Sequence, residues 1–450
     1  MKATALTAAD VAAAVARLRP SGAQDAAVAE VVSWLVEQVR SKGDAGLVEA
    51  TARLDWPGAT VAGLRVPAAD LAAAAYDLED DLRAALELAR DNCRWFHEHE
   101  LRASWEEAGS QGQLLGIRYL PVGRAGLYVP GGLGSYASSV IMNAVPAQVA
   151  GVTSLFICTP PARDGSVNAS VLAAAHLLGV DEVYRVGGAQ AIAAMAYGTE
   201  SIRRADVISG PGNAYVTEAK RQVSGVVGID GLAGPSEVVV VAAADCDPRW
   251  AAADLLAQEE HGSGASAVLV AESAEVCAGV ASEVERLRDE YGRGGSSGSG
   301  DGSAPGRGSA SGGGPPSGGA LHAFFPASGE PFQELAVAFV NEYAPEHLEI
   351  HLRDPRAFLD RVQAAGAVFV GAHTPTAFGD YVAGSNHVLP TGGAARFSSA
   401  LSVDTFVRRM SVIEVPPDAA RLLTPPLARI AQSEGFGFHR ISAEQRSGRA

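Results

Sequence analysis

The sequence predicts an α/β protein whose parallel strands are covered by helices, and three features of its middle region carry this prediction. Between residues 116 and 245, short runs rich in β-branched residues alternate with helix-like runs. Glycine-rich turns separate many of these runs, as is typical of strands and helices joined by tight connections. The segment 237–244 consists mostly of valine and alanine, as expected for a strand that is buried on both faces.

The expected elements follow this alternation in chain order. Residues 1 to about 110 are expected to be helical, because apolar residues recur at helical spacing over 28–39 and few breakers interrupt 68–98. Strands are expected at 153–158, 182–186, 205–209, 237–244, 267–271 and 367–370, and helices at 167–178, 189–197, 214–223, 248–258, 274–291 and 330–341. After residue 371 the chain is rich in Gly, Thr, Ser and Pro, and helical pieces are expected near Ala419 and Leu427.

Residues 292–319 interrupt the α/β pattern. They are almost wholly Gly, Ser and Pro, so they cannot bury enough apolar surface to offset the entropy lost on ordering. We interpret them as a flexible surface insertion and not as a domain boundary, since the α/β pattern resumes near Pro331. A tether for a partner is the alternative interpretation.

Composition excludes several classes of protein. The 35 basic and 51 acidic residues give a net charge of −16, which argues against a general nucleic-acid or anionic-membrane binder. Four scattered cysteines, none in a C-x-x-C pair, fit a reducing compartment. The sequence lacks an unbroken apolar run of about 18 residues and a basic start followed by an apolar core, so we expect a cytoplasmic protein without a membrane span.

Four glycine-rich turns could bring the backbone close to a ligand, at 129–132, 186–190, 209–213 and 231–236. The dinucleotide fingerprint G-x-G-x-x-G with a following acidic residue is absent. The pattern alone therefore favours nucleotide binding only weakly, and tight turns in a compact α/β domain explain the glycines equally well.

A possible metal site begins at Gln258 and His261, which close a helix-like run. Their spacing of three residues puts both side chains on one helix face. Imidazole is the commonest protein ligand for zinc, although a lone His at a helix end often only interacts with the last carbonyls. Asp380 and His439 would complete a set of N and O ligands suited to zinc, but spacing does not show that the four meet.

Glu346 and His347 form a possible acid/base pair. Because Pro345 suits the first position of a helix, both are expected in the first helical turn. His is the better base near neutral pH. The alternative is a helix start that is enriched in Glu because of the helix dipole.

Together these strings resemble the histidinol dehydrogenase family over most of the chain. The matching strings are YVPGG at 128–132, GGAQAIA at 187–193, ISGPGNAYV at 208–216, GPSEV at 234–238, QEEHG at 258–262, APEHLE at 344–349, GDY at 379–381 and NHVLPT at 386–391. The resemblance implies an α/β fold of two incomplete Rossmann-like parallel-sheet domains plus small N- and C-terminal helical segments, which accounts for the missing fingerprint. It also implies a cytoplasmic, zinc-dependent homodimer that oxidises L-histidinol to L-histidine through L-histidinal with NAD.

The resemblance assigns a role to each matching residue. It implies Glu346 and His347 as the catalytic acid/base pair, Tyr128, Gln190 and Asn213 as NAD contacts, and Gln258, His261, Asp380 and His439 as zinc ligands. It implies Ser236, His387 and Glu434 as substrate contacts, together with His347 and the zinc ligands. Because the C-terminal tail of this family crosses to the partner subunit, Glu434 and His439 are expected to serve the partner's site.

The expected domains are an N-terminal helical segment 1–25, a first α/β domain of 26–127 and 245–380, a second, NAD-contacting α/β domain of 128–244, and a tail of 381–450. The chain departs from the family pattern at 292–319, and Phe324-Phe325 is interpreted as a remnant of a strand there. Three alternatives to this function stay open: a paralogous zinc- and NAD-dependent dehydrogenase of another small polar alcohol, a zinc hydrolase that uses Glu346, and a binding protein without turnover.

Overall fold

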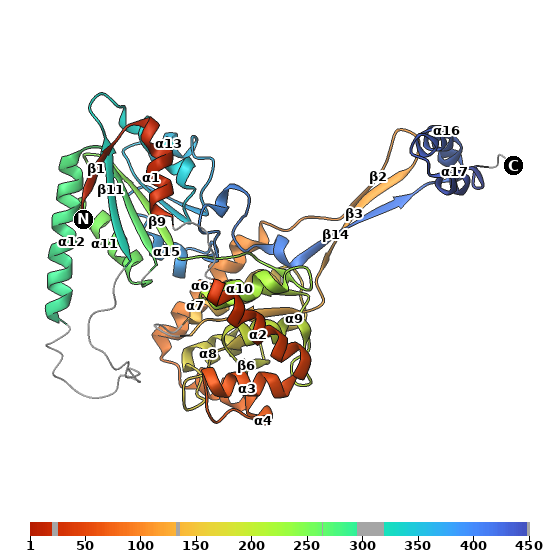
Figure 1. Ribbon diagram of the computed structural model, residues 1–450, viewed down its shortest axis with the longest axis horizontal. Coiled ribbons are helices and arrows are strands. Elements are labelled where there is room, and N and C mark those ends of the chain that lie inside the picture. Colours follow the sequence, from red (N-terminus) through yellow and green to blue (C-terminus); the bar gives the residue numbers. More distant parts are fainter. Residues whose placement is uncertain (20–25, 132–135, 263, 295–318, 448–450) are drawn as a thin grey trace.

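The computed structural model describes residues 1–19, 26–131, 136–262, 264–294 and 319–447. It contains a six-stranded and a five-stranded parallel sheet, each covered by helices, and a three-stranded antiparallel sheet that projects from them as an arm (Figure 1). Within the described ranges, no helix is both long and apolar enough to cross a bilayer. Most of the insertion expected at 292–319 lies outside the described residues, so its interpretation stays a prediction.

The six-stranded sheet has the order β1-β11-β10-β9-β12-β13, and all its neighbours are parallel. Its strands are β1 (Ala3–Leu6), β9 (Glu237–Ala242), β10 (Ser266–Ala271), β11 (Ala320–Pro326), β12 (His347–His351) and β13 (Ala367–Val370). The helices of this domain are α1 (Val11–Leu18), α11 (Pro248–Glu259), α12 (Ala274–Gly294), α13 (Phe332–Tyr343), α14 (Pro355–Leu359) and α15 (Thr376–Tyr381), and the 3-10 turn η1 (Ala8–Asp10) precedes α1.

The five-stranded sheet has the order β6-β5-β4-β7-β8, again with parallel neighbours only. Its strands are β4 (Ala125–Tyr128), β5 (Leu155–Thr159), β6 (Val183–Arg185), β7 (Val207–Ser209) and β8 (Gly228–Ile229). Its helices are α2 (Ala26–Lys42), α3 (Asp44–Leu54), α4 (Val61–Leu64), α5 (Ala68–Tyr76), α6 (Asp80–Glu98), α7 (Ala137–Val149), α8 (Ala169–Leu177), α9 (Gly188–Tyr197) and α10 (Ala214–Val223).

Both sheets share one topology. Counting from β9 in the first sheet and from β4 in the second, the five strands lie in the order third, second, first, fourth, fifth. This order places a switch point between the first and fourth strands, where the connections leave in opposite directions and ligands of α/β sheets usually bind. The predicted fold class of two Rossmann-like parallel sheets is therefore confirmed.

Strand β9 shows why these residues form a central strand. Side chains alternate between the two faces of a strand, so a strand with helices on both sides must be apolar throughout. Val239 and Val241 pack into a core with α1 and α13, whereas Val238 and Val240 pack into a core with α11 and α12. The five-stranded sheet is likewise enclosed by two cores, one under α7 and α8 and one under α2, α9 and α10.

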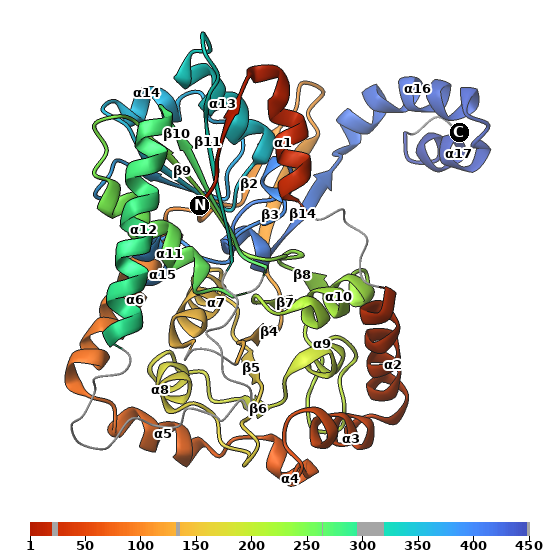
Figure 2. The ribbon, with the colours of Figure 1, turned by 60° about the vertical axis from the view of Figure 1, so that its left-hand side comes forward.

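The arm is built from segments that are far apart in the sequence. Strand β3 (Leu114–Pro121) pairs antiparallel with β2 (Trp105–Ala108) and with β14 (Val407–Glu414). The 3-10 turns η2 (Ala394–Arg396) and η3 (Val403–Phe406) precede β14. Helices α16 (Pro417–Ser433) and α17 (Gly437–Glu444) form the end of the arm, away from both parallel sheets (Figure 1, Figure 2).

Several expectations differ from this structure. The N-terminal segment is not wholly helical, because β1 joins the edge of the six-stranded sheet. Helices α2, α3, α5 and α6, within 26–98, pack mainly on helices of the five-stranded domain, although 26–127 was expected to join 245–380. β9 lies inside the six-stranded sheet, although 128–244 was expected to form one domain. The strand β14 was not expected at all. The strand inferred at Phe324-Phe325 is confirmed as β11.

A buried ion pair fixes the turn after β7. The Lys220 ammonium on α10 contacts the Asp230 carboxylate and donates to the Gly210 carbonyl at 2.9 Å, while Asp230 accepts from the Gly210 N–H at 2.8 Å. Gly210 has φ of +117°, and a β-carbon there would collide with the Tyr128 carbonyl. The turn therefore needs both this glycine and this ion pair.

We expect Lys220→Met to lower the free energy of unfolding by about 3 to 5 kcal/mol, because it leaves a buried carboxylate without its partner. Lys42→Met is the matched control, since Lys42 makes a 3.3 Å ion pair with Glu49 at the surface and should change stability by less than about 1 kcal/mol. Urea denaturation of both variants measures the difference. Equal effects of the two substitutions would contradict the role given to the buried pair.

Candidate active site

The predicted site residues of the main body lie between the two parallel sheets. Tyr128 ends β4, and Asn213 begins α10 after β7, so both stand at the carboxyl ends of the five-stranded sheet. Ser236 and His347 stand instead at the amino ends of β9 and β12 in the other sheet. A cavity of about 440 Å³ is lined by Asn213, Ser236 and His261 together, so it reaches from one domain to the other. This volume is within the usual range for small-molecule sites.

The backbone of Glu237 contacts both members of the predicted acid/base pair. Its N–H donates to the Glu346 carboxylate at 2.8 Å, and its carbonyl lies 3.0 Å from His347 Nδ1. The Ser236 hydroxyl donates to the same Glu346 oxygen, Oε2, at 2.7 Å. Both groups are thus oriented by the parallel pairing of β9 with β12. The expected helix at 346–347 was wrong, because His347 is the first residue of a strand.

The hydrogen bond to Glu237 determines which nitrogen of His347 can act as a base. A carbonyl oxygen only accepts hydrogen bonds, so Nδ1 carries a proton in both forms, and the lone pair of the neutral ring is on Nε2. Among the described residues, this buried Nε2 has no hydrogen-bond partner, and its nearest charged group is Asp380 Oδ1 at 3.7 Å. Burial lowers the pKa of His347, but Glu346 and Asp380 outweigh it and raise the pKa to about 9.

Glu346 lies in a setting that favours proton uptake. Its side chain is 9 % exposed, and burial raises its pKa above the usual range despite His347, Ser236 and the Glu237 N–H, which act to lower it. A carboxylate with a raised pKa accepts a proton more readily near neutral pH. Glu346 can therefore act as a general base toward a water molecule.

Three of the four predicted zinc ligands lie on the same side of this pair. Gln258 is buried in the last turn of α11, and His261 follows just beyond the helix end. Asp380 is on α15, and although burial would raise its pKa, the neighbouring His347, His387 and His261 hold it below its ordinary value. The buried amide nitrogen of Gln258 has no partner among the described residues. An amide, an imidazole and a carboxylate are thus gathered here.

His387 is fixed beside Asp380. Its Nδ1 lies 2.9 Å from the Asp380 backbone carbonyl and its Nε2 lies 3.3 Å from the Ser139 hydroxyl. Both ring nitrogens therefore already have polar neighbours, and a substrate that contacts His387 would take the place of Ser139. Sequence reasoning missed Ser139, which lies within α7 and has no motif of its own.

The predicted NAD contacts surround the switch point of the five-stranded sheet. The Tyr128 hydroxyl accepts from the Gly188 N–H at 3.1 Å, and Asn213 caps α10 by accepting from the Tyr215 and Val216 N–H groups. Gln190 donates to Asp55 at 3.0 Å, while its buried Oε1 has no partner among the described residues. Asp55 was also missed, because a single Asp at a helix end carries no specific signal.

The two predicted site residues of the C-terminal tail, Glu434 and His439, do not lie near the other predicted site residues. Glu434 and His439 lie near the turn between α16 and α17 at the end of the arm, far from α11 and α15 in Figure 1. Both are exposed and line a hollow of about 860 Å³ with Leu427, Ile430 and Phe436. A single chain therefore supplies three of the four predicted zinc ligands at one place.

Comparisons with known proteins agree on one family. The family model described as histidinol dehydrogenase matches residues 18–296 and 332–447. The chain is 46 % identical to histidinol dehydrogenase of Synechococcus sp., over 92 % of this chain and 91 % of that protein. It is 44 % identical to histidinol dehydrogenase of Rhizobium meliloti, over 91 % of this chain and 89 % of the relative.

A solved structure agrees as well. The crystal structure of histidinol dehydrogenase from Elizabethkingia anophelis superimposes with a TM-score of 0.86 at 29 % identity, over 99 % of this chain and 98 % of that one. The match of the family model to most of the chain, the identities of the relatives and this superposition lead to the same conclusion: the chain belongs to the histidinol dehydrogenase family.

Proposed function

We propose that the residues around His347 carry out both oxidations that turn L-histidinol into L-histidine through L-histidinal, the last step of histidine biosynthesis, with NAD as the hydride acceptor. The observation that carries this proposal is that the backbone N–H and carbonyl of Glu237 contact Glu346 and His347, respectively. It places two proton acceptors of different kind side by side, next to a cavity that reaches the predicted coenzyme site. An alcohol oxidation needs one base, and hydration of an aldehyde needs a second.

The residues fit a zinc ion. Gln258, His261 and Asp380 supply O and N ligands, and the buried amide nitrogen of Gln258 has no hydrogen-bond partner among the described residues. His439 would complete the set from the arm of another subunit. When bound there, the zinc ion would hold the imidazole and amine of the substrate. Its positive charge would also counteract the rise in the pKa of His347 that the Asp380 carboxylate causes.

The residues also fit NAD. The cavity meets the N-terminus of α10, where the positive end of the helix dipole favours a phosphate. The buried Gln190 Oε1 is an acceptor without a partner among the described residues, close to the turn after β6. We therefore assign Tyr128, Gln190 and Asn213 to the coenzyme, in the crevice where Rossmann-like sheets bind theirs.

In the first oxidation, His347 Nε2 takes the hydroxyl proton of histidinol while hydride leaves the same carbon for the nicotinamide. The Glu237 carbonyl stabilises the imidazolium that forms, because it accepts from Nδ1–H. The proton must leave His347 before the second oxidation. Ser236 keeps Glu346 oriented through Oε2 during this step.

In the second oxidation, Glu346 takes a proton from a water molecule that adds to the aldehyde carbon, and the aldehyde becomes the anion of its hydrate. His347 then takes a hydroxyl proton of the hydrate while a second hydride leaves, and the carboxylate of histidine forms. Burial of Glu346 and His347 limits the access of bulk water, which favours retention of the aldehyde between the steps.

We further propose a homodimer with shared sites. The end of the arm exposes Leu422, Ile430, Phe436 and Phe438 around Glu434 and His439, and such a group of exposed apolar side chains is typical of a contact surface. A second copy related by twofold symmetry would place Glu434 and His439 at the other subunit's zinc and substrate site. We also place the protein in the cytoplasm, where unpaired thiols such as its four cysteines persist.

The two bases should separate in half-reaction assays. We expect His347→Asn to slow the oxidation of histidinol by about 10²- to 10⁴-fold, because the proton acceptor is lost. Glu346→Gln should slow the oxidation of histidinal by a similar factor and that of histidinol only a few-fold. NADH formation from each substrate measures both. His373→Gln, at an exposed His outside the site, is the control, and equal slowing of both half-reactions by Glu346→Gln would refute this division of roles.

Shared sites should be visible in mixed dimers. His261→Asn and His439→Asn should each be nearly inactive alone, whereas subunits exchanged between them should recover about one quarter of the wild-type activity. Half of the dimers would then be mixed, and each mixed dimer would have one site that contains both His261 and His439. Activity that stays absent after verified subunit exchange would show that each site is built from one chain.

A further inference from the structure

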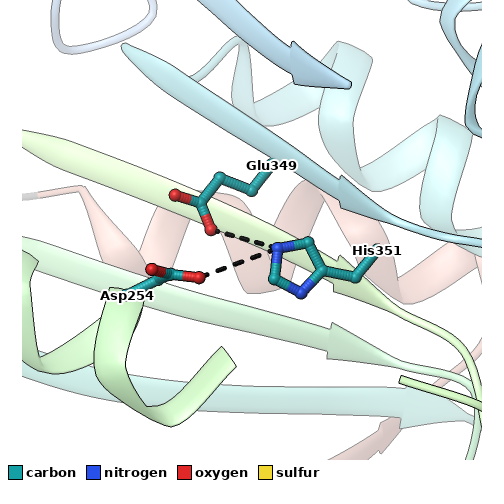
Figure 3. A group of neighbouring side chains, drawn as sticks. All are labelled: Asp254, Glu349 and His351. Atoms are coloured by element: carbon teal, nitrogen blue, oxygen red, sulfur yellow. Dashed lines mark ion pairs between the residues drawn. The ribbon is translucent and has the colours of Figure 1, made fainter. Parts of the chain in front are cut away.

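A second group of titratable side chains lies on the six-stranded domain, apart from the acid/base pair. It consists of Asp254 from α11 and Glu349 and His351 from β12, whose side chains point toward one another (Figure 3). His351 Nε2 is 3.4 Å from Glu349 Oε2 and 3.7 Å from Asp254 Oδ2. Glu349 and His351 are fully buried, and the Asp254 side chain is 12 % exposed. None of the three has a role in the proposed reaction.

The group lies where an α/β sheet usually binds a ligand. β9 and β12 form the switch point of the six-stranded sheet, His351 is the last residue of β12, and α11 is the helix that follows β9. The corresponding switch point of the five-stranded sheet, between β4 and β7, is where we place NAD. His347 stands at the opposite, amino end of β12, about 13 Å from His351 along the strand.

Outer hydrogen bonds orient two of the side chains so that one atom of each stays free. Glu349 Oε1 accepts from the Thr376 N–H at 2.7 Å and from its hydroxyl at 2.6 Å. His351 Nδ1 lies 3.5 Å from the Cys246 sulfur, which in turn lies 3.4 Å from the Asp247 carbonyl. In the tautomer whose Nδ1–H points to the sulfur, Nε2 has the lone pair. Metal-binding His and carboxylate side chains are usually held by such outer contacts.

The two free atoms, Glu349 Oε2 and His351 Nε2, face each other at 3.4 Å. Within the described residues, neither Glu349 Oε2 nor His351 Nε2 has a hydrogen-bond partner, although both are buried. Within the same residues, Asp254 and Glu349 form ion pairs with His351 and with no Lys or Arg. Two carboxylates and a neutral imidazole would leave a buried negative charge, which is costly unless a cation or a proton balances it.

The spacing suits a cation. Ligand atoms about 2.0 to 2.2 Å from a tetrahedral zinc ion lie about 3.3 to 3.6 Å from one another. The two distances to His351 Nε2, 3.4 and 3.7 Å, are close to that range, and all three ligand atoms lie within 4.8 Å of one another. One imidazole and two carboxylates suit zinc and similar divalent ions.

We propose that Asp254, Glu349 and His351 bind a second divalent metal ion of the zinc type, through Oδ2, Oε2 and Nε2, with water as the remaining ligand. Such an ion joins α11 to β12. Gln258 lies one helical turn after Asp254, so the same ion holds the helix end that carries the predicted active-site ligands.

A proton is the competing occupant of this group. Burial and the neighbouring Glu349 raise the pKa of Asp254 to about 8, so without a cation Asp254 holds a proton near neutral pH. Metal and proton then compete for the same oxygen, and binding of the ion should strengthen as the pH rises toward 8.

Metal content of the full-length protein tests the proposal. Protein stripped with a chelator and reloaded with zinc alone should hold about two ions per chain at pH 8, against about one for His351→Gln and about one for His261→Asn. His373→Gln is the matched control and should keep both. A crystal of the zinc-loaded wild type, measured at the zinc absorption edge, should show anomalous density between Asp254, Glu349 and His351.

The outcomes separate this inference from the proposed function. One ion per chain that is lost in His261→Asn and kept in His351→Gln, with no anomalous density at the triad, would overturn the second site and leave the active-site zinc standing. The triad would then hold a proton only. An ion lost in His351→Gln and kept in His261→Asn would support the second site and contradict the zinc ligands of the proposed function. If His351→Gln does not fold, the wild-type density alone decides.

Discussion

The pairing of β9 with β12 is the interaction on which the site depends. In this parallel register, His347 lies opposite Val238, so the peptide groups of Glu237 reach both Glu346 and His347. Backbone groups hold the two predicted bases, and a backbone position is set by the whole sheet and not by one rotatable side chain. The core on either side of β9, made of valines that alternate between its faces, keeps that sheet rigid. The hydrophobic core and the candidate site therefore share one structural element.

The two domains share one topology but direct opposite ends of their strands toward the shared cavity. The five-stranded sheet presents its carboxyl ends to the shared cavity, which is where a Rossmann-like sheet is suited to bind a coenzyme. The six-stranded sheet presents the amino ends of β9 and β12, and its own switch point is left free at the other end. The triad of Asp254, Glu349 and His351 occupies that place. One duplicated architecture thus offers two crevices, of which only one faces the cavity.

Much of the fold could be predicted from the sequence because its central strands are buried on both faces. Such strands are continuous apolar runs, so β9 and β10 appeared where expected. Glu346 and His347 were predicted near each other but in the wrong element, because Pro345 is a local helix signal and the pairing with β9 is a long-range one. That error also concealed the triad, since residues 349 and 351 share a face in a strand but not in a helix.

β14 was missed because its half-exposed residues lack an apolar run. The pattern of one chain also cannot show which subunit's arm contributes to which site.

The central claim is that one site performs both oxidations without release of the aldehyde. Zinc-loaded protein, incubated with a limiting amount of L-histidinol and excess NAD, tests it most directly when NADH, histidinal and histidine are measured together. The arrangement of Glu346 beside His347 predicts about two NADH for each histidinol consumed, with histidine as the product and no free histidinal. One NADH per histidinol with histidinal accumulating in solution, or no NADH at all, would contradict it.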